Sequence, residues 1–211
     1  MLDLPGLFQR FRIPVIGVIH VGAYIGTEDS TYRVMGFTNR LFIEAQPDTY
    51  EVLRTNLAGL GALCEQVAIS DRVGTSKFHI VNFAQSSSLL ELARHKDVAP
   101  DIHAVSTIDV ATTTLDALLA RPDYRHLRFN FLNMDIQGAE MLALRGATES
   151  LRVLDALSLE INFDELYAGA PHVSELDAFL RERGFTRTDS VSSHNSWGDG
   201  FWVRDHLTKV A

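Results

Sequence analysis

The architecture of this chain follows from residues 15–26, which read Val15-Ile-Gly-Val-Ile-His-Val-Gly-Ala-Tyr-Ile-Gly26. The first seven residues form a short, mostly β-branched run that predicts a buried strand ending at Gly22. A helix is predicted over residues 26–35. Because Gly22 and Gly26 lack a Cβ atom, the connecting turn can be sharp and its backbone can approach a ligand closely. These glycines alone favour a tight turn that binds nothing over a ligand-binding turn, by roughly two to one.

Strands and helices alternate along the rest of the chain. Further strands are predicted at residues 40–44, 63–70, 129–134 and 153–161, and helices at residues 47–57, 138–146 and 174–184. This alternation is typical of an α/β protein with a doubly wound, mostly parallel sheet that is covered on both faces. Two late strands, residues 185–191 and 200–204, have no helix between them and are predicted to form an antiparallel edge. Residues 77–81 are predicted to hairpin onto the same sheet.

The length and organisation indicate a single domain over residues 1–211. A chain of 211 residues suits one α/β domain, and no repeat or linker interrupts it. Residues 82–113 fit the alternation least, because they form a long polar connection. We expect this segment to be a partly helical flap over the functional edge of the sheet.

Composition narrows the class of protein. Hydrophobic residues make up 46% of the chain, which excludes a disordered protein. The net charge of −8 argues against a nucleic-acid partner, whose phosphates call for Lys and Arg. The single cysteine, Cys64, favours a reducing compartment, and no run approaches the roughly 20 apolar residues of a membrane helix. With an acid near the start instead of a signal peptide's positive charge, a soluble cytoplasmic protein without a membrane span is expected.

An acid after the second strand points to a nucleoside ligand. Glu44 ends that strand, 18 residues after Gly26. In doubly wound folds an acid there accepts hydrogen bonds from ribose hydroxyls. The dinucleotide pattern requires a central glycine that admits a pyrophosphate, whereas this turn holds Tyr24 and Ile25. The turn therefore favours a nucleoside without a diphosphate, with S-adenosylmethionine as the cofactor, over a nucleotide-dependent oxidoreductase.

In these and further segments the chain resembles the FkbM-type S-adenosylmethionine-dependent methyltransferases. The matching segments span nearly the whole chain, and residues 134–140, Met134-Asp-Ile-Gln-Gly-Ala-Glu140, are the most distinctive. The others lie at residues 19–28, 42–48, 67–71, 86–90, 114–116 and 160–167. The resemblance implies a class I methyltransferase fold, a Rossmann-like seven-stranded sheet whose last strand is antiparallel. It also implies O-methylation of a hydroxyl on a small-molecule natural product or a glycan.

The resemblance further implies where the cofactor binds. The matching positions are Gly22, Ala23 and Gly26 for the methionine part, Glu44 for the ribose, Ala68 and Ile69 for the adenine, and Asp135 beside the reacting methyl group. One position departs from the pattern. Class I methyltransferases usually carry an acid two residues before the first glycine, where this chain has His20, a further cofactor-binding candidate.

Three residues are candidates for taking the proton of an acceptor hydroxyl. Asp135 follows a strand at the edge where open α/β sheets bind ligands, although it can also cap the next helix. Glu160 ends another strand and has the alternative role of a buried structural acid. His95 lies in the flap and has a pKa suited to proton transfer, although loop histidines are more often simply solvated. Glu140 fits a catalytic or a structural role equally well.

Acceptor binding falls to the flap and neighbouring loops, because so short a chain has no separate substrate domain. The candidates for contacting a small-molecule or glycan acceptor are Ser87, Asn162, His194 and Trp197. No pair of candidate ligands has metal-binding spacing on one element, so no metal is predicted. A methyltransferase-like binding module without catalysis is a further alternative. The sequence leaves the acceptor and the oligomeric state open.

Overall fold

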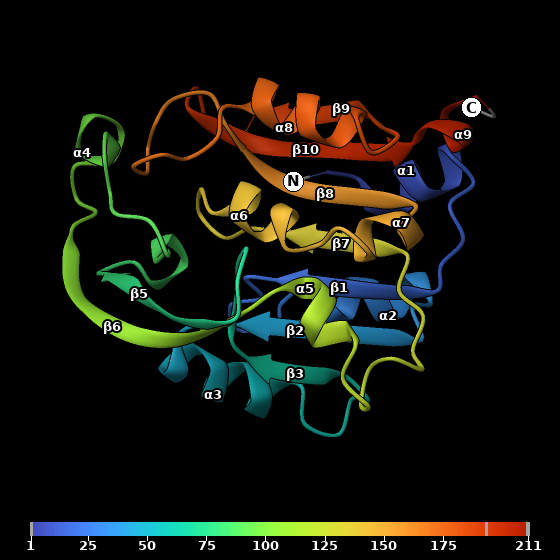
Figure 1. The fold of residues 1–211 in the computed structure, drawn as a ribbon, viewed down its shortest axis with the longest axis horizontal. Coiled ribbons are helices and arrows are strands. Elements are labelled where there is room, and N and C mark those ends of the chain that lie inside the picture. The colour runs from blue at the N-terminus through green and yellow to red at the C-terminus, as the bar shows by residue number, and fades with distance from the viewer. Residues whose placement is uncertain (1, 193, 210–211) are drawn as a thin grey trace.

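The computed structural model describes residues 2–192 and 194–209. Seven strands form the main sheet, in the order β3 (Leu63–Gln66), β2 (Asn39–Glu44), β1 (Gly17–Val21), β7 (Phe131–Met134), β8 (Ala156–Asn162), β10 (Trp197–Arg204) and β9 (Phe185–Ser192) (Figure 1). The first five are parallel, and β10 pairs antiparallel with both β8 and β9. The predicted α/β class, with a mostly parallel seven-stranded sheet and an antiparallel last strand, is confirmed.

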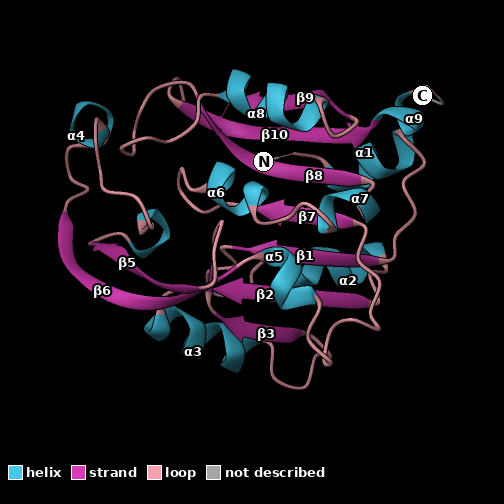
Figure 2. Ribbon diagram, in the orientation of Figure 1, coloured by secondary structure: helices cyan, strands magenta, loops and turns pink. Residues whose placement is uncertain are grey.

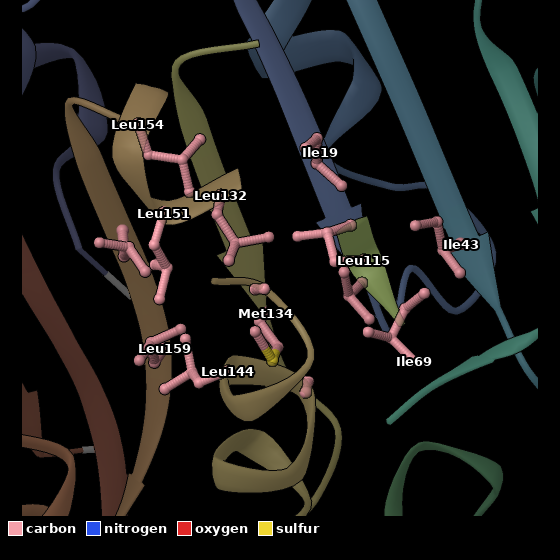
Figure 3. Close-up of a cluster of buried hydrophobic side chains, with 14 of the residues drawn as sticks. Ile19, Ile43, Ile69, Leu115, Leu132, Met134, Leu144, Leu151, Leu154 and Leu159 are labelled. Carbon is pink, nitrogen blue, oxygen red and sulfur yellow. The ribbon is translucent and has the colours of Figure 1, made fainter. Parts of the chain in front are cut away.

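Both faces of this sheet are covered by helices. Successive residues of the central strands point to opposite sides and are apolar on both, so each face must be buried. Ile19 and Val21 of β1 join one buried cluster, which contains side chains of α5 (Leu115–Leu119), α6 (Glu140–Arg145), α7 (Ser150–Val153) and α8 (Val173–Arg181). Figure 3 shows part of this cluster, with leucines from three of these helices against the strands. Val18 faces the other side, as expected for a strand that is apolar on both faces.

The opposite face is packed with aromatic side chains. It is covered by α1 (Leu4–Arg10), α2 (Asp29–Met35) and α3 (Pro47–Asn56), and a short helix, α9 (Asp205–Thr208), follows β10. Phe8 of α1 lies edge-on to Phe131 of β7, with ring centroids 5.1 Å apart, and within 6.4 Å of Phe201 of β10. The sequence analysis did not predict α1, yet this helix closes the apolar core on that side.

A second, smaller sheet is present, and it differs from two predictions made from the sequence. It consists of β4 (Ala68–Ile69), β6 (Ala104–Thr113) and β5 (Gly74–Val81), in that order. The predicted strand at 63–70 divides at Val67, so that β3 stays in the main sheet and β4 pairs with β6. The prediction that residues 77–81 hairpin onto the main sheet is wrong, because β5 pairs along its length with β6.

The segment at 82–113, predicted as a partly helical flap, contains helical turns and also a strand that was not predicted. Its helical part is a 3₁₀ turn (Ala84–Ser86) and α4 (His95–Val98), whereas its last ten residues are β6. The β-branched Val105, Ile108 and Val110 favour an extended chain, and the polar residues between them kept this strand from being recognised. Figures 1 and 2 show the second sheet and α4 beyond the carboxyl ends of the parallel strands.

Two element boundaries also differ from the predictions. The strand predicted at 153–161 begins only at Ala156, because residues 150–153 form α7. The helix predicted from a cap at Ser174 has His172 as its N-cap, with Glu175 completing a capping box.

Replacing Phe8 by Ala tests the role of α1. Phe8 is 4% exposed, so the substitution removes a buried aromatic ring and leaves a cavity. We expect a loss of about 3–5 kcal/mol in the free energy of unfolding, measured by urea denaturation. Val34→Ala, at a side chain that is 89% exposed, is the control and should change stability by less than about 0.5 kcal/mol. Equal effects of the two substitutions would contradict the assignment of α1 to the core.

Candidate functional site

A cavity of about 570 Å³ lies at the carboxyl ends of β1, β2, β7 and β8. Its walls come from the loop after β1, from β4, from the segment between β5 and α4, from the loop after β7, and from β10. The volume falls within the range of small-molecule sites, about 300–1,000 Å³. The cavity thus occupies the edge at which open α/β sheets bind ligands.

Most of the predicted site residues line this cavity. From the cofactor candidates these are His20, Gly22, Ala23, Glu44, Ala68, Ile69 and Asp135, and from the catalytic and acceptor candidates Glu160, Ser87 and Trp197. Gly26, Asn162 and His194 are described but do not line it. The side chain of His95 lies outside the described part of the chain, so its predicted role stays a prediction.

Glu44 faces the cavity in an orientation that two backbone groups determine. Its Oε2 accepts a hydrogen bond from the N–H of Tyr24 at 2.9 Å, and its Oε1 accepts one from the N–H of Gln46 at 2.8 Å. Tyr24 has φ = 49°, a left-handed conformation uncommon for a residue with a side chain. Burial raises the pKa of Glu44, while the backbone donors oppose that rise. A carboxylate has about four acceptor positions, so Glu44 keeps acceptor capacity for a ligand hydroxyl beside its backbone donors.

Gly22 and Gly26 serve packing in a way that the sequence analysis did not foresee. A Cβ atom at Gly22 would lie 1.8 Å from the carbonyl oxygen of Asp135, and at φ = 76° the backbone is left-handed. The close approach at this position is therefore to the loop after β7. Gly26 packs beneath α3, where a Cβ would meet Leu53 at 2.8 Å. Gly26 does not line the cavity, and its contact with the cofactor stays a prediction.

Gln137 bridges two acids at the floor of the cavity. Its side-chain Nε2 donates to Asp135 Oδ1 at 2.6 Å and to Glu160 Oε2 at 3.1 Å. Its Oε1 accepts from the Tyr167 hydroxyl at 2.6 Å, so both ends of the amide are engaged. Gln137 itself has φ = 58°. A residue in this conformation indicates that the surrounding structure imposes the bridge.

Three neighbouring acids, Asp135, Glu140 and Glu160, have raised pKa values. Burial is the largest cause for each of them, followed for Glu160 by the charges of Asp135 and Glu140. The pKa of Asp135 rises to about 6 and that of Glu140 to about 7, and the pKa of Glu160 is also raised. A hydrogen bond from Glu160 and one from Gln137 favour the ionised form of Asp135. Glu160 therefore holds its proton to a higher pH than an exposed glutamate, and Asp135 is ionised above a pH of about 6.

His20 lies at the other side of the cavity in an aromatic and amide environment. Its Nδ1 is 3.3 Å from the Tyr32 hydroxyl and its Nε2 is 3.4 Å from Asn133 Nδ2. Burial lowers the pKa of His20, so the ring is neutral at physiological pH. Glu28 also lines the cavity, with Oε2 4.0 Å from His20 Nδ1.

The charged side chains of the cavity wall are acidic. Its acids are Glu28, Glu44, Asp135, Glu160 and Asp199, and among the described residues that line it none is lysine or arginine. Such a wall favours ligands that carry positive charge and disfavours anionic ones. Within residues 2–192 and 194–209, no group of three or more His, Cys, Asp or Glu is arranged to hold a metal ion.

The acceptor candidates occupy different surroundings. Trp197 lines the cavity and stacks on the ring of His194 at 4.3 Å. Ser87 lines the cavity, and its Oγ accepts a hydrogen bond from the N–H of Val81 at 3.2 Å. Asn162 is buried at the end of β8, where both its side-chain polar atoms lack partners among the described residues.

Two site residues were missed by the sequence analysis although both lie in segments that carried the resemblance. Glu28 ends the first of these segments and Gln137 lies within the most distinctive one. Their side chains join the site through the positive-φ turn at residue 137 and the loop before α2, which residue patterns do not reveal. In the described part of the chain no helix is long and apolar enough to cross a membrane.

Comparison with known proteins gives a family. A family model described as the methyltransferase FkbM domain matches residues 20–186. The solved FkbM methyltransferase of Methylobacillus flagellatus KT aligns with 89% of this chain and 43% of its own, at 13% identity and a TM-score of 0.58. The chain thus spans less than half the length of that protein. A search of curated protein sequences gives no match.

Two further solved structures share the fold. Magnesium protoporphyrin IX methyltransferase from Synechocystis PCC 6803, with bound S-adenosylmethionine, aligns with 97% of this chain and 85% of its own, at 8% identity and a TM-score of 0.51. A Pyrococcus horikoshii protein described as an RNA methyltransferase aligns with 96% and 81%, at 12% identity and a TM-score of 0.53. These likenesses show a Rossmann-like methyltransferase fold.

Glu140 gives a prediction about stability and pH. Its side chain is fully buried, and burial raises its pKa from 4.5 to about 7. The folded protein therefore binds this proton more tightly than the unfolded chain does, and the resulting stabilisation is lost as the pH rises from 4.5 through 7. Glu140→Gln removes this loss, so between pH 4.5 and 8 the variant should gain up to about 3 kcal/mol relative to the unaltered protein.

Urea denaturation at the two pH values measures this difference. Glu149→Gln, at a carboxylate that is 66% exposed, is the control and should show no such trend. A difference for Glu140→Gln that stays the same at pH 4.5 and 8 would contradict the raised pKa.

Proposed function

Because the chain belongs to the FkbM methyltransferase family, we propose that it transfers a methyl group from S-adenosylmethionine to a hydroxyl group of a small molecule or a glycan. The observation that carries this proposal is the orientation of Glu44 at the end of β2. Its carboxylate is fixed by two backbone N–H groups and lines the cavity beside the Gly22 turn. An acid in this place suits the two hydroxyls of a ribose.

The remaining cavity wall fits the other parts of such a cofactor. Ala68 and Ile69 of β4, with Phe78 of β5, offer an apolar surface for an adenine ring. The acids near the carboxyl end of β7 suit the positive charge of a sulfonium and an ammonium group. When bound, S-adenosylmethionine supplies the methyl group for an in-line displacement, and the protein's main task is to align the acceptor.

Asp135 is the proposed base. Its side chain is open to the cavity, and its pKa of about 6 leaves it ionised at neutral pH, close to the value that suits proton transfer. It would take the proton from the acceptor hydroxyl as the oxygen attacks the methyl carbon. Gln137 and Glu160 position it through hydrogen bonds, and the pKa of Glu160 is raised by burial and by the charge of Asp135.

The acceptor is proposed to be neutral or cationic. The acidic wall disfavours phosphate groups, which speaks against a nucleic-acid substrate, although a protein described as an RNA methyltransferase shares the fold. Trp197 offers a flat apolar surface for a sugar or ring, with His194 stacked behind it. The free, half-buried Cys64 supports a reducing compartment such as the cytoplasm.

Two alternatives make different predictions. A nucleotide-dependent oxidoreductase on this sheet would bind a dinucleotide and no S-adenosylhomocysteine. A binding module without catalysis would bind S-adenosylhomocysteine but methylate nothing. Calorimetry with S-adenosylhomocysteine tests the first alternative, and a screen of hydroxylated acceptors with labelled S-adenosylmethionine tests the second.

Replacing Glu44 by Ala tests the cofactor site. We expect the Kd for S-adenosylhomocysteine to rise by about tenfold or more, because the ribose hydroxyls lose a charged acceptor. Isothermal calorimetry measures the change. Glu51→Gln, at an exposed acid of α3, is the control and should leave the Kd unaltered. An unaltered Kd in Glu44→Ala would refute the ribose assignment.

Replacing Asp135 by Asn separates catalysis from binding. We expect kcat to fall by about 10²–10⁴-fold, since the general base is lost, while the Kd for S-adenosylhomocysteine changes far less. The two quantities are measured by transfer of labelled methyl groups and by calorimetry. Equal losses in both would assign Asp135 to cofactor binding alone.

A further inference from the structure

Glu28 is an acid of the cavity wall to which the function proposed above gives no role. It follows the Gly22 turn and is the residue before α2, and its side chain is 31% exposed. It does not cap α2, because its carboxylate makes no hydrogen bond to the first turn of that helix. Among the described residues, the contact given for its carboxylate is the 4.0 Å approach to His20 Nδ1.

His20 does not neutralise this carboxylate. The ring is 4% exposed, and its two nitrogens lie against the Tyr32 hydroxyl and the Asn133 amide. Burial lowers the pKa of His20 more than the charge of Glu28 raises it, so the imidazole is uncharged near neutral pH. With no lysine or arginine among the described residues of the wall, Glu28 faces the cavity without a cation.

Asp135, on the loop after β7, is a second carboxylate that lines the same cavity. The charge of Glu28 is one of the causes that raise the pKa of Asp135. A positively charged group in this cavity would be attracted by both carboxylates, and a hydrogen bond from it to Glu28 would be charge-assisted.

We infer that Glu28 binds the ammonium group of the amino-acid part of S-adenosylmethionine. The inference rests on the function proposed above. Glu44, Gly22 and Glu28 line one cavity, so a cofactor whose ribose bound Glu44 would have Glu28 available for its amino-acid part. The segment from Gly22 to Glu28 would then serve both polar ends of the cofactor, because the N–H of Tyr24 orients Glu44 for the ribose and the carboxylate of Glu28 faces the cavity.

The test compares two ligands that differ in this group. S-adenosylhomocysteine carries the ammonium, whereas 5′-methylthioadenosine has the same adenosine and lacks the amino-acid part. In Glu28→Gln the Kd for S-adenosylhomocysteine should rise by about tenfold or more, because a charge-assisted hydrogen bond is lost. The Kd for 5′-methylthioadenosine should stay the same. Both are measured by calorimetry on the whole chain.

Controls separate the possible failures. Glu51→Gln is the matched control variant and should alter neither Kd, and thermal unfolding of Glu28→Gln should match that of the unaltered protein. If neither Kd changes in Glu28→Gln, or both rise equally, the inference is wrong while the proposed cofactor stands. If the unaltered protein binds neither ligand, the proposed function fails and the inference fails with it.

Discussion

The contact between the Gly22 backbone and the carbonyl oxygen of Asp135 brings the ends of β1 and β7 together at the centre of the sheet. No side chain fits between them, since a Cβ at residue 22 would lie 1.8 Å from that oxygen. The N–H of Asp135 in turn donates to the carbonyl oxygen of Val21. This closeness places the acids of the β7 loop against the turn that carries Tyr24 and Glu28, and the cavity exists in this form because of it.

The carboxyl groups at the cavity floor both have raised pKa values. The Asp135 carboxyl is open to the cavity and accepts a hydrogen bond from Gln137, whereas Glu160 is buried and lies beside the charge of Asp135. The amide of Gln137 donates to both, which keeps two mutually repelling groups in place. Burial of Glu160 and Glu140 costs stability at neutral pH, a cost that is common where a site is built for ligand binding.

The main sheet was predictable because its signals are local. The β-branched run before Gly22 and the apolar run at residues 156–162 identify buried strands without reference to anything distant. The cofactor wall was largely predictable for the same reason, since Glu44 and Asp135 end such strands. The second sheet was not, because the polar, exposed residues of β6 conceal an extended segment. The bridge at Gln137 depends on a left-handed backbone and on Tyr167, 30 residues away in sequence, and neither leaves a periodic signal.

The serine run at residues 86–88 joins the small sheet to the loop after β7. The hydroxyl of Ser88 donates to the carbonyl oxygen of Gln137 at 2.8 Å, and the carbonyl oxygen of Ser86 accepts from the Tyr167 hydroxyl that also contacts Gln137. The small sheet cannot swing outward without breaking these bonds. If an acceptor entered by such a movement, Gln137 would lose its hydrogen bonds to Ser88 and Tyr167. Opening of the cavity would then be coupled to the positions of Asp135 and Glu160, which Gln137 holds.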